Sequence, residues 1–177
     1  MTLDEEIVSA FSDLERPSPT TIATASCDRP NLEALAVQEF FAPLLWTEVD
    51  IERLYRYKGD KSSCLLFMSE SAFLYYFPAY LRMILVDTAK TSALLLPVLS
   101  LLGARDQAAY YYELMQLNYD IDKCRCIVKS LYAVDERFVK LYGGIPVSGP
   151  RPNEIAEIWK ANLTDGCASR PGTRSAR

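Results

Sequence analysis

The strongest constraint on folding lies between residues 64 and 86, the most apolar part of this 177-residue chain. Ser69 is placed to cap a helix here, and large apolar side chains occupy most of its faces: Phe73, Leu74, Tyr76, Phe77, Tyr80, Leu81, Ile84 and Leu85. A helix that is apolar all round must be buried by its neighbours. Polar residues interrupt the stretch before it reaches the ~20 apolar residues that span a bilayer. We therefore expect a central core helix, which Pro78 should kink or split.

Helical periodicity and end signals predict further helices on both sides of this segment. The expected ranges are 2–14, 31–41, 50–57, 91–102, 106–117, 120–141 and 153–163. In the second of these, Leu32, Leu35, Ala36 and Phe40 are expected to face the core. The fold class is therefore all-α, a single-domain helical bundle of about seven or eight helices. Residues 22–25 also allow a short β element near residue 22.

The domain is expected to cover residues 1–163, followed by a disordered basic tail over residues 164–177. The N-terminus is acidic, unlike a secretory signal, and the five cysteines are an odd number. Free thiols are typical of a reducing compartment, so a cytoplasmic protein is expected. No segment predicts a membrane span.

Charge is distributed unevenly along the chain. Residues 1–52 hold eleven acidic and two basic residues, a net charge of −9, whereas the whole chain carries −4 and the remainder therefore +5. An acidic block repels nucleic-acid phosphates and attracts basic surfaces. Ordinary solvated helix faces are the alternative explanation of this block.

The residue types limit the available chemistry. The chain has no histidine, which removes His-dependent catalysis and most zinc sites. Cys124 and Cys126 lie at positions i and i+2 of an expected helix, so Cys124 should face the core and Cys126 should not. No glycine-rich phosphate-binding motif is present. We expect no catalytic residues, no metal and no cofactor.

Two groups of residues are candidates for contact with a partner protein. Tyr110, Tyr111 and Tyr112 cannot all face the core, because successive helical residues are about 100° apart. Exposed tyrosines are common at protein interfaces. Combined with the acidic block, this pattern indicates a partner-binding set, of which the members are Glu33, Glu39, Glu48, Asp50, Tyr111 and Tyr112.

The segment Phe73-Leu74-Tyr75-Tyr76-Phe77-Pro78-Ala79-Tyr80-Leu81 resembles the core of a bacterial family of small helical proteins catalogued as a domain of unknown function. The resemblance extends over residues 3–133, through Ala10-Phe11, the proline-containing loop at 17–19 and the segment that leads to Trp46. The chain lacks the family's glycine before Trp46. The family implies no established activity and no catalytic residues. Small acidic helical proteins of this kind look like immunity proteins, and this likeness is an analogy between folds.

The sequence therefore predicts a cytoplasmic protein-binding protein and not an enzyme. The preferred hypothesis is an immunity protein that neutralises a bacterial toxin by occluding a basic active site; no nucleic acid and no membrane are expected as partners. The alternatives are a homo-oligomeric regulatory or structural protein, and a metal-dependent enzyme that uses paired carboxylates, either Glu33 with Glu39 or Glu48 with Glu52. The oligomeric state stays open.

Overall fold

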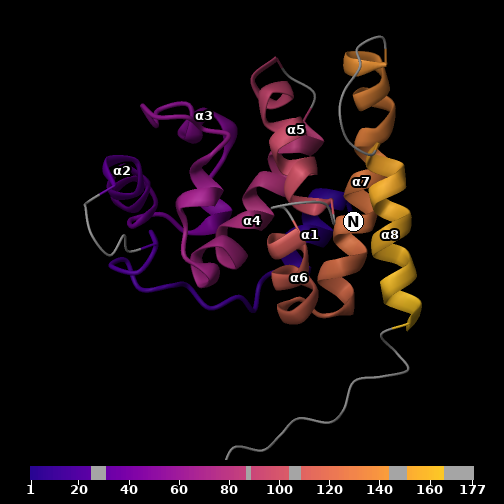
Figure 1. Cartoon of the computed structure of the whole chain (residues 1–177), viewed down its shortest axis with the longest axis horizontal. Coiled ribbons are helices and arrows are strands. Elements are labelled where there is room, and N and C mark those ends of the chain that lie inside the picture. Colours follow the sequence, from indigo (N-terminus) through magenta and orange to yellow (C-terminus); the bar gives the residue numbers. More distant parts are fainter. Residues whose placement is uncertain (25–30, 87–88, 104–108, 144–150, 166–177) are drawn as a thin grey trace, which may run out of the picture.

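A computed structural model describes residues 1–24, 31–86, 89–103, 109–143 and 151–165. The described residues form an all-α bundle, as expected (Figure 1). Its α-helices are α1 (Leu3–Ala10), α2 (Leu32–Phe41), α3 (Ile51–Leu54), α4 (Glu70–Leu85), α5 (Ala89–Leu102), α6 (Ala109–Asn118), α7 (Ile121–Tyr142) and α8 (Pro152–Asp165). Two short 3-10 helices, η1 (Trp46–Glu48) and η2 (Cys64–Phe67), lie between them.

Helix α4 is the core of the bundle, as its apolar sequence predicts. It packs against α1, α5, α6 and α7 and against both 3-10 helices, and Phe73, Phe77 and Leu81 are fully buried. Pro78 does not split it, because α4 runs unbroken through that residue. Proline removes one backbone donor, but burial on all sides holds the two halves of the helix in place.

Side chains at the helix starts determine where several helices begin. Thr2 and Glu5 form the expected capping box, and the side chains of Asn31, Ser69 and Asp120 accept backbone N–H groups of α2, α4 and α7. These caps satisfy donors that have no partner within the helix. The capping residues therefore mark these helix starts in the sequence itself.

Several helix boundaries differ from the expectation. Helix α5 begins at Ala89, two residues earlier than expected, and residues 106–108 of the expected helix 106–117 lie outside the described residues. Helix α1 ends at Ala10, where the hydroxyl of Ser12 donates to the carbonyl of Ser9 at 2.8 Å and so competes with the helical ladder. Helix α3 is confined to four residues. Helix α8 begins at Pro152, since proline is well suited to the first helical position.

The expected β element near residue 22 is reduced to one antiparallel bridge between Ala23 and Met68. Hydrogen bonds from Ser69 N to the Ile22 carbonyl (2.7 Å) and from Thr24 N to the Phe67 carbonyl (2.9 Å) flank it. The bridge fixes the chain that follows α1 to the start of α4. No strand occurs in the described ranges.

The last helix ends later than the sequence predicts. Helix α8 continues to Asp165, beyond the predicted domain end at residue 163. The remainder of the predicted tail, residues 166–177, lies outside the described residues. Among the helices described, none has the length and apolar character needed to cross a membrane.

Candidate protein-binding surface

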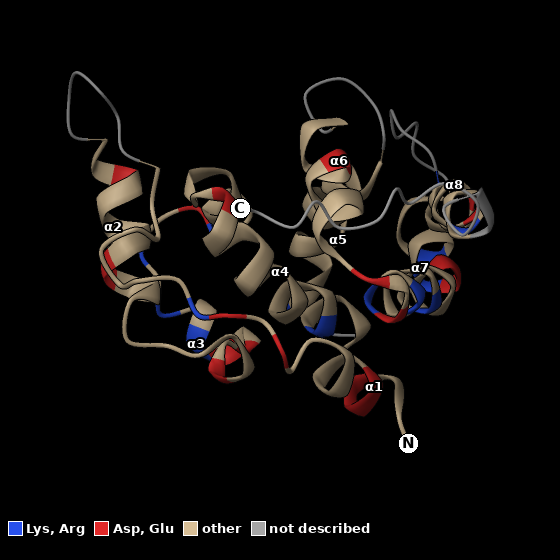
Figure 2. Ribbon diagram, turned by 90° about the horizontal axis from the view of Figure 1, so that it is seen from below, with Lys and Arg blue, Asp and Glu red and all other residues tan. Residues whose placement is uncertain are grey.

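Five of the eleven acidic residues of the N-terminal block form ion pairs within the described part of the molecule. Carboxylates of α1, of η1 and of the segments that follow them form ion pairs with bases mostly from later in the chain. Figure 2 marks the positions of acidic and basic residues along the ribbon. The pairs are Asp4–Arg82 (2.6 Å), Asp13–Lys123 (2.8 Å), Glu52–Lys90 (2.6 Å), Glu48–Arg53 (3.8 Å) and Glu6–Lys129. Four of these acids therefore pair with bases of α4, α5 and α7 and hold the block against these helices.

Three of the four carboxylates in the predicted partner-binding set also have local structural roles. Glu33 accepts a 2.5 Å hydrogen bond from the hydroxyl of Tyr57. Glu48 accepts from the amide of Leu45, and Asp50 caps α3 by accepting from the amide of Arg53, each at 2.7 Å. Glu39 is exposed, and no residue in the described part of the chain bonds or pairs with its carboxylate.

Tyr111 and Tyr112, the two tyrosines of the predicted partner-binding set, lie on α6. Helix α6 is separate from α2 (Figure 1). Tyr112 is buried against Trp159, with ring centroids 5.2 Å apart, and accepts a hydrogen bond from Asn162. Tyr111 is half-buried on Phe73. The exposed member of the triplet is Tyr110, at 50% exposure. The spacing required one exposed tyrosine but did not show which.

Helix α2 presents apolar side chains to solvent. Leu32 is 79% and Leu35 is 45% exposed, so the expectation that they face the core is wrong. The buried residues are Ala34, Val37 and Phe41, which have the same helical spacing and lie on the side of α2 that packs against η2. The sequence signal for an exposed apolar face is thus the presence of two apolar stripes on one helix, of which only one can face the core.

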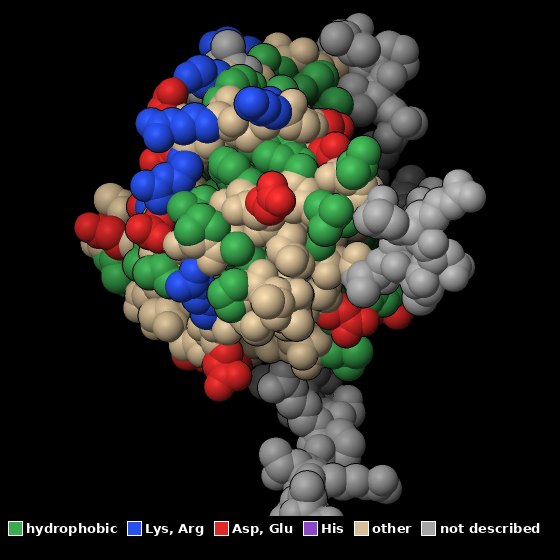
Figure 3. Space-filling view, turned by 90° about the vertical axis from the view of Figure 1, so that its left-hand side faces the viewer, with side chains coloured by type: hydrophobic (Ala, Val, Ile, Leu, Met, Phe, Trp, Pro, Cys, Tyr) green, Lys and Arg blue, Asp and Glu red, His purple; other side chains and the backbone are tan. Residues whose placement is uncertain are grey.

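Leu32, Leu35 and Glu39 form the α2 outer face. With residues about 100° apart, the three side chains project from one side of the helix, opposite Ala34, Val37 and Phe41. Helix α2 is at the edge of the molecule in Figures 1 and 2. Figure 3 views that side of the molecule and shows hydrophobic side chains interspersed with acidic ones, with Lys and Arg side chains mainly at the upper left.

A basic segment runs beside α2. Its members are Arg56, Lys58 and Lys61. The segment contacts α2 through Tyr57, whose hydroxyl donates to Glu33 and whose ring lies 5.4 Å from that of Phe40. Burial and the hydrogen bond to Glu33 both raise the pKa of Tyr57, so the phenol stays a donor at neutral pH.

The contact between the basic segment and α2 requires glycine at position 59. A Cβ atom there would lie 2.2 Å from Glu33 Oε1 and 2.6 Å from the Tyr57 hydroxyl. We expect Gly59→Ala to displace these side chains and to lower the free energy of unfolding by about 1 kcal/mol, the value of one hydrogen bond. Urea denaturation measures this loss. In a Tyr57→Phe background the same substitution should cost clearly less; equal losses in both backgrounds would contradict the explanation.

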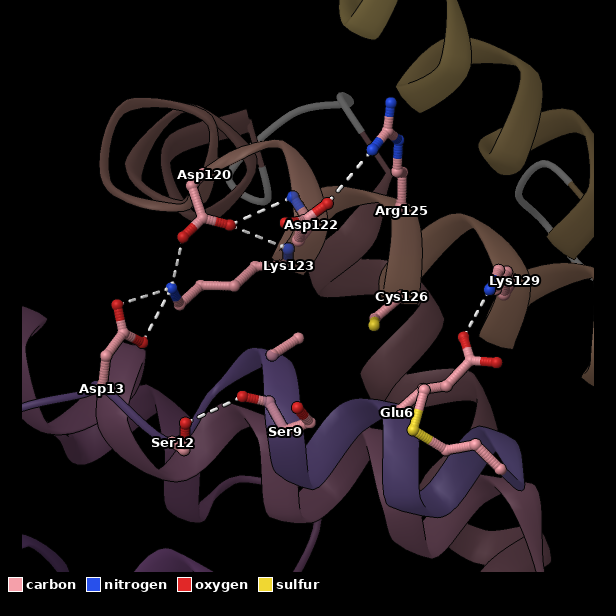
Figure 4. A pocket seen from close by; sticks show the side chains of 12 residues that line it. Glu6, Ser9, Ser12, Asp13, Asp120, Asp122, Lys123, Arg125, Cys126 and Lys129 are labelled. Carbon is pink, nitrogen blue, oxygen red and sulfur yellow. Dashed lines mark hydrogen bonds and ion pairs between the residues drawn. The ribbon is translucent and has the colours of Figure 1, made fainter.

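A charged pocket of about 540 Å³ lies between α1 and α7 (Figure 4). The ammonium group of Lys123, only 3% exposed as a residue, lies 2.8 Å from Asp13 and 2.5 Å from Asp120. Arg125 pairs with Asp122, and Lys129 with Glu6. The charged side chains that line the pocket thus pair with one another, which makes it a docking contact between two helices.

Cys126 lines this pocket and is buried, contrary to the expectation that it points away from the core. Helix α7 packs against α1 as well as α8, so both cysteine-bearing sides are covered. Burial raises the pKa of the Cys126 thiol, which disfavours the reactive thiolate. Cys64 and Cys124 are likewise buried.

Comparison of the chain with protein-family models, with curated proteins and with solved structures finds no match. The functional argument therefore depends on the geometry of the α2 outer face. Within the described ranges, no group of three or more Cys, Asp or Glu side chains is arranged to hold a metal ion.

Proposed function

We propose that this chain is a protein-binding protein of the immunity type, which neutralises a bacterial toxin by covering its active site with the α2 outer face. The exposure of Leu32 and Leu35 carries the binding part of the proposal. Exposed apolar groups with a polar rim are typical of protein interfaces. The immunity role rests on the analogy between small acidic helical proteins and immunity proteins, and on the lack of histidine-based chemistry.

The chemistry of this face indicates the kind of partner. Leu32 and Leu35 would enter an apolar depression, and Glu39, which pairs with no described residue, would meet a basic group beside it. A net charge of −4 adds long-range attraction to a basic cleft. Such attraction raises association rates and weakens as salt increases.

The test uses the full chain as bait in lysate of its source cell, at low and high salt. We expect wild type to retain one protein and the Leu32→Asp/Leu35→Asp variant to lose it, because two carboxylates would be desolvated at the contact. Leu117→Asp on α6 is the matched control, since Leu117 is 83% exposed and lies outside the α2 outer face.

The recovered protein then decides the immunity role. Expressed alone it should arrest growth, and co-expression of the chain should relieve the arrest, whereas co-expression of the double variant should not. Equal recovery by wild type and the double variant would exclude the α2 outer face. A recovered protein without toxicity would exclude the immunity role and leave the binding role.

A second candidate function, a homo-oligomeric protein, is favoured by the same two exposed leucines. Light scattering separates it from a monomeric binder. The third alternative, a carboxylate enzyme, would show a rise in melting temperature with Mg²⁺, Mn²⁺, Ca²⁺ or Zn²⁺.

A further inference from the structure

We propose that the α2 outer face and the basic segment together form a self-complementary interface, which a second copy of this chain covers. The inference deepens the second candidate function, because it names the surface through which a homo-oligomer would form, and it does not depend on a toxin. It concerns what occupies Leu32 and Leu35 when the chain is alone. Three observations carry it: two exposed leucines, an acid on the same face that pairs with no described residue, and a basic segment fixed at their side.

The first step is the relative position of these groups. Glu33 and Phe40 contact Tyr57, so the basic segment lies along the flank of α2 that these two residues share. At about 100° per residue this flank is roughly a quarter turn from the α2 outer face and a quarter turn from the buried side. The α2 outer face and the basic segment are therefore neighbours on one side of the molecule.

The second step concerns the charged side chains that form no ion pair within the described part of the chain. Arg56 and Lys58 are exposed, and neither forms an ion pair with any residue in the part of the chain that the structure describes. Glu39 on the α2 outer face is likewise exposed and forms no ion pair with a described residue. Opposite charges thus lie side by side without neutralising each other, and two leucines lie next to them.

The third step is symmetry. A two-fold interface brings the same patch of both subunits together, so that residue i of one contacts residue j of the other, and the reverse. With the axis between Glu39 and the basic segment, Glu39 of each copy would face Arg56 and Lys58 of the other copy. The exposed leucines, which lie beside Glu39, would be buried in the same contact. One patch therefore supplies both halves of a complementary contact.

The geometry disfavours single-stranded nucleic acid as the occupant. The ammonium groups of Lys61 and Lys90 lie 5.5 and 5.3 Å from the centroid of the Tyr55 ring, whose hydroxyl donates to the Lys90 carbonyl. The ring is thus not a free platform for base stacking. Glu39 on the adjoining face would repel phosphate.

The test measures the mass of the full chain by light scattering and sedimentation over a range of concentrations. Wild type should approach twice the 20.0 kDa of one chain. Glu39→Lys, and separately Arg56→Glu/Lys58→Glu, should each weaken self-association about tenfold or more, because every charge change occurs twice in the dimer. Leu117→Asp should behave as wild type.

Mixing the two charge variants is the decisive measurement. In a mixed pair, the lysine introduced at position 39 of one variant faces the two glutamates introduced in the other, while the second contact keeps its native charges. A one-to-one dimer should therefore return, and its return also shows that both variants are folded. A single-chain mass for wild type at every concentration, or no return on mixing, overturns the proposal.

Two outcomes separate this inference from the proposed function. A monomeric wild type whose toxin partner is lost with Leu32→Asp/Leu35→Asp would refute the homodimer and support the proposed function. Retention of a single-stranded oligonucleotide by monomeric wild type, lost in Arg56→Glu/Lys58→Glu, would likewise refute the homodimer.

Discussion

Trp159→Ala is expected to lower the free energy of unfolding by about 3–5 kcal/mol, the cost of deleting a large buried aromatic side chain. Trp159 is fully buried on α8 and stacks edge-to-face on Tyr112, and its indole N–H donates to the Leu102 carbonyl at 3.0 Å. The substitution removes packing between α6 and α8 and leaves a buried carbonyl without a donor. Urea denaturation with an unchanged m-value measures the loss.

Two further variants identify what Trp159 contributes. Trp159→Phe keeps most of the ring and removes the donor, so it should cost about 1–3 kcal/mol. Ile158→Ala, at the exposed neighbouring position, should change stability by no more than about 0.5 kcal/mol. A loss below about 1 kcal/mol for Trp159→Ala would contradict the placement of α8 as part of the core.

The core was predictable because its signals are local. Ser69, Asn31 and Asp120 are capping residues at the start of apolar-periodic segments, and the sequence from Phe73 to Leu85 leaves no polar side on which α4 could meet water. The periodicity likewise places Trp159 on the last helix, where the structure has it. In each case the residue and its neighbours within one or two turns determine the outcome.

The candidate surface was less predictable because it depends on contacts distant in sequence. Nothing local to Leu32 shows that η2, well beyond α2 in the chain, covers the other side of this helix. Likewise, Cys126 is buried because α1 packs on its side of α7, which the i, i+2 spacing does not reveal. The acidic block illustrates the same limit, since its ion-pair partners Arg82, Lys123 and Lys129 lie on α4 and α7.

The second large effect is expected at the pocket between α1 and α7. Asp13→Asn combined with Asp120→Asn would leave the ammonium of Lys123 buried with no opposing charge, which costs about 3–5 kcal/mol. Asparagine is chosen because it still caps α7, where Asp120 accepts the amides of Asp122 and Lys123. Chemical denaturation at neutral pH measures the loss.

Lys123→Met is the matched control, because it keeps a long apolar stem and removes the charge. Asp13 and Asp120 would then remain hydrated, since both side chains are at least half exposed. The cost should be at most about 1 kcal/mol. If the lysine variant were as unstable as the double asparagine variant, charge burial would not be the cause, and packing of the lysine stem would be.

The pH dependence gives an independent check on this ion pair. Desolvation would raise the pKa of Asp120, but hydrogen bonds from Lys123 and from two backbone amides outweigh it and hold the pKa below the ordinary 3.8. A lowered folded-state pKa contributes stability that is present above pH 3.8 and is lost as the pH falls through the folded value. Wild type should therefore lose stability below about pH 4 more steeply than the double asparagine variant.

At alkaline pH the stability contributed by Lys123 changes in the opposite direction, since it is lost as the pH rises. Burial alone would lower the pKa of Lys123, yet its hydrogen bonds to Asp120 and Asp13 raise it above 10.5. A raised pKa contributes stability that is complete below 10.5 and is lost as the pH rises through the folded value. The ion pair should thus contribute a constant amount between about pH 5 and pH 9, where the unfolding free energies of wild type and Lys123→Met, which has no ammonium group to titrate, should differ by the same margin. A change of this margin within the range would show that Lys123 of wild type titrates there, and would contradict a stably charged lysine between α1 and α7.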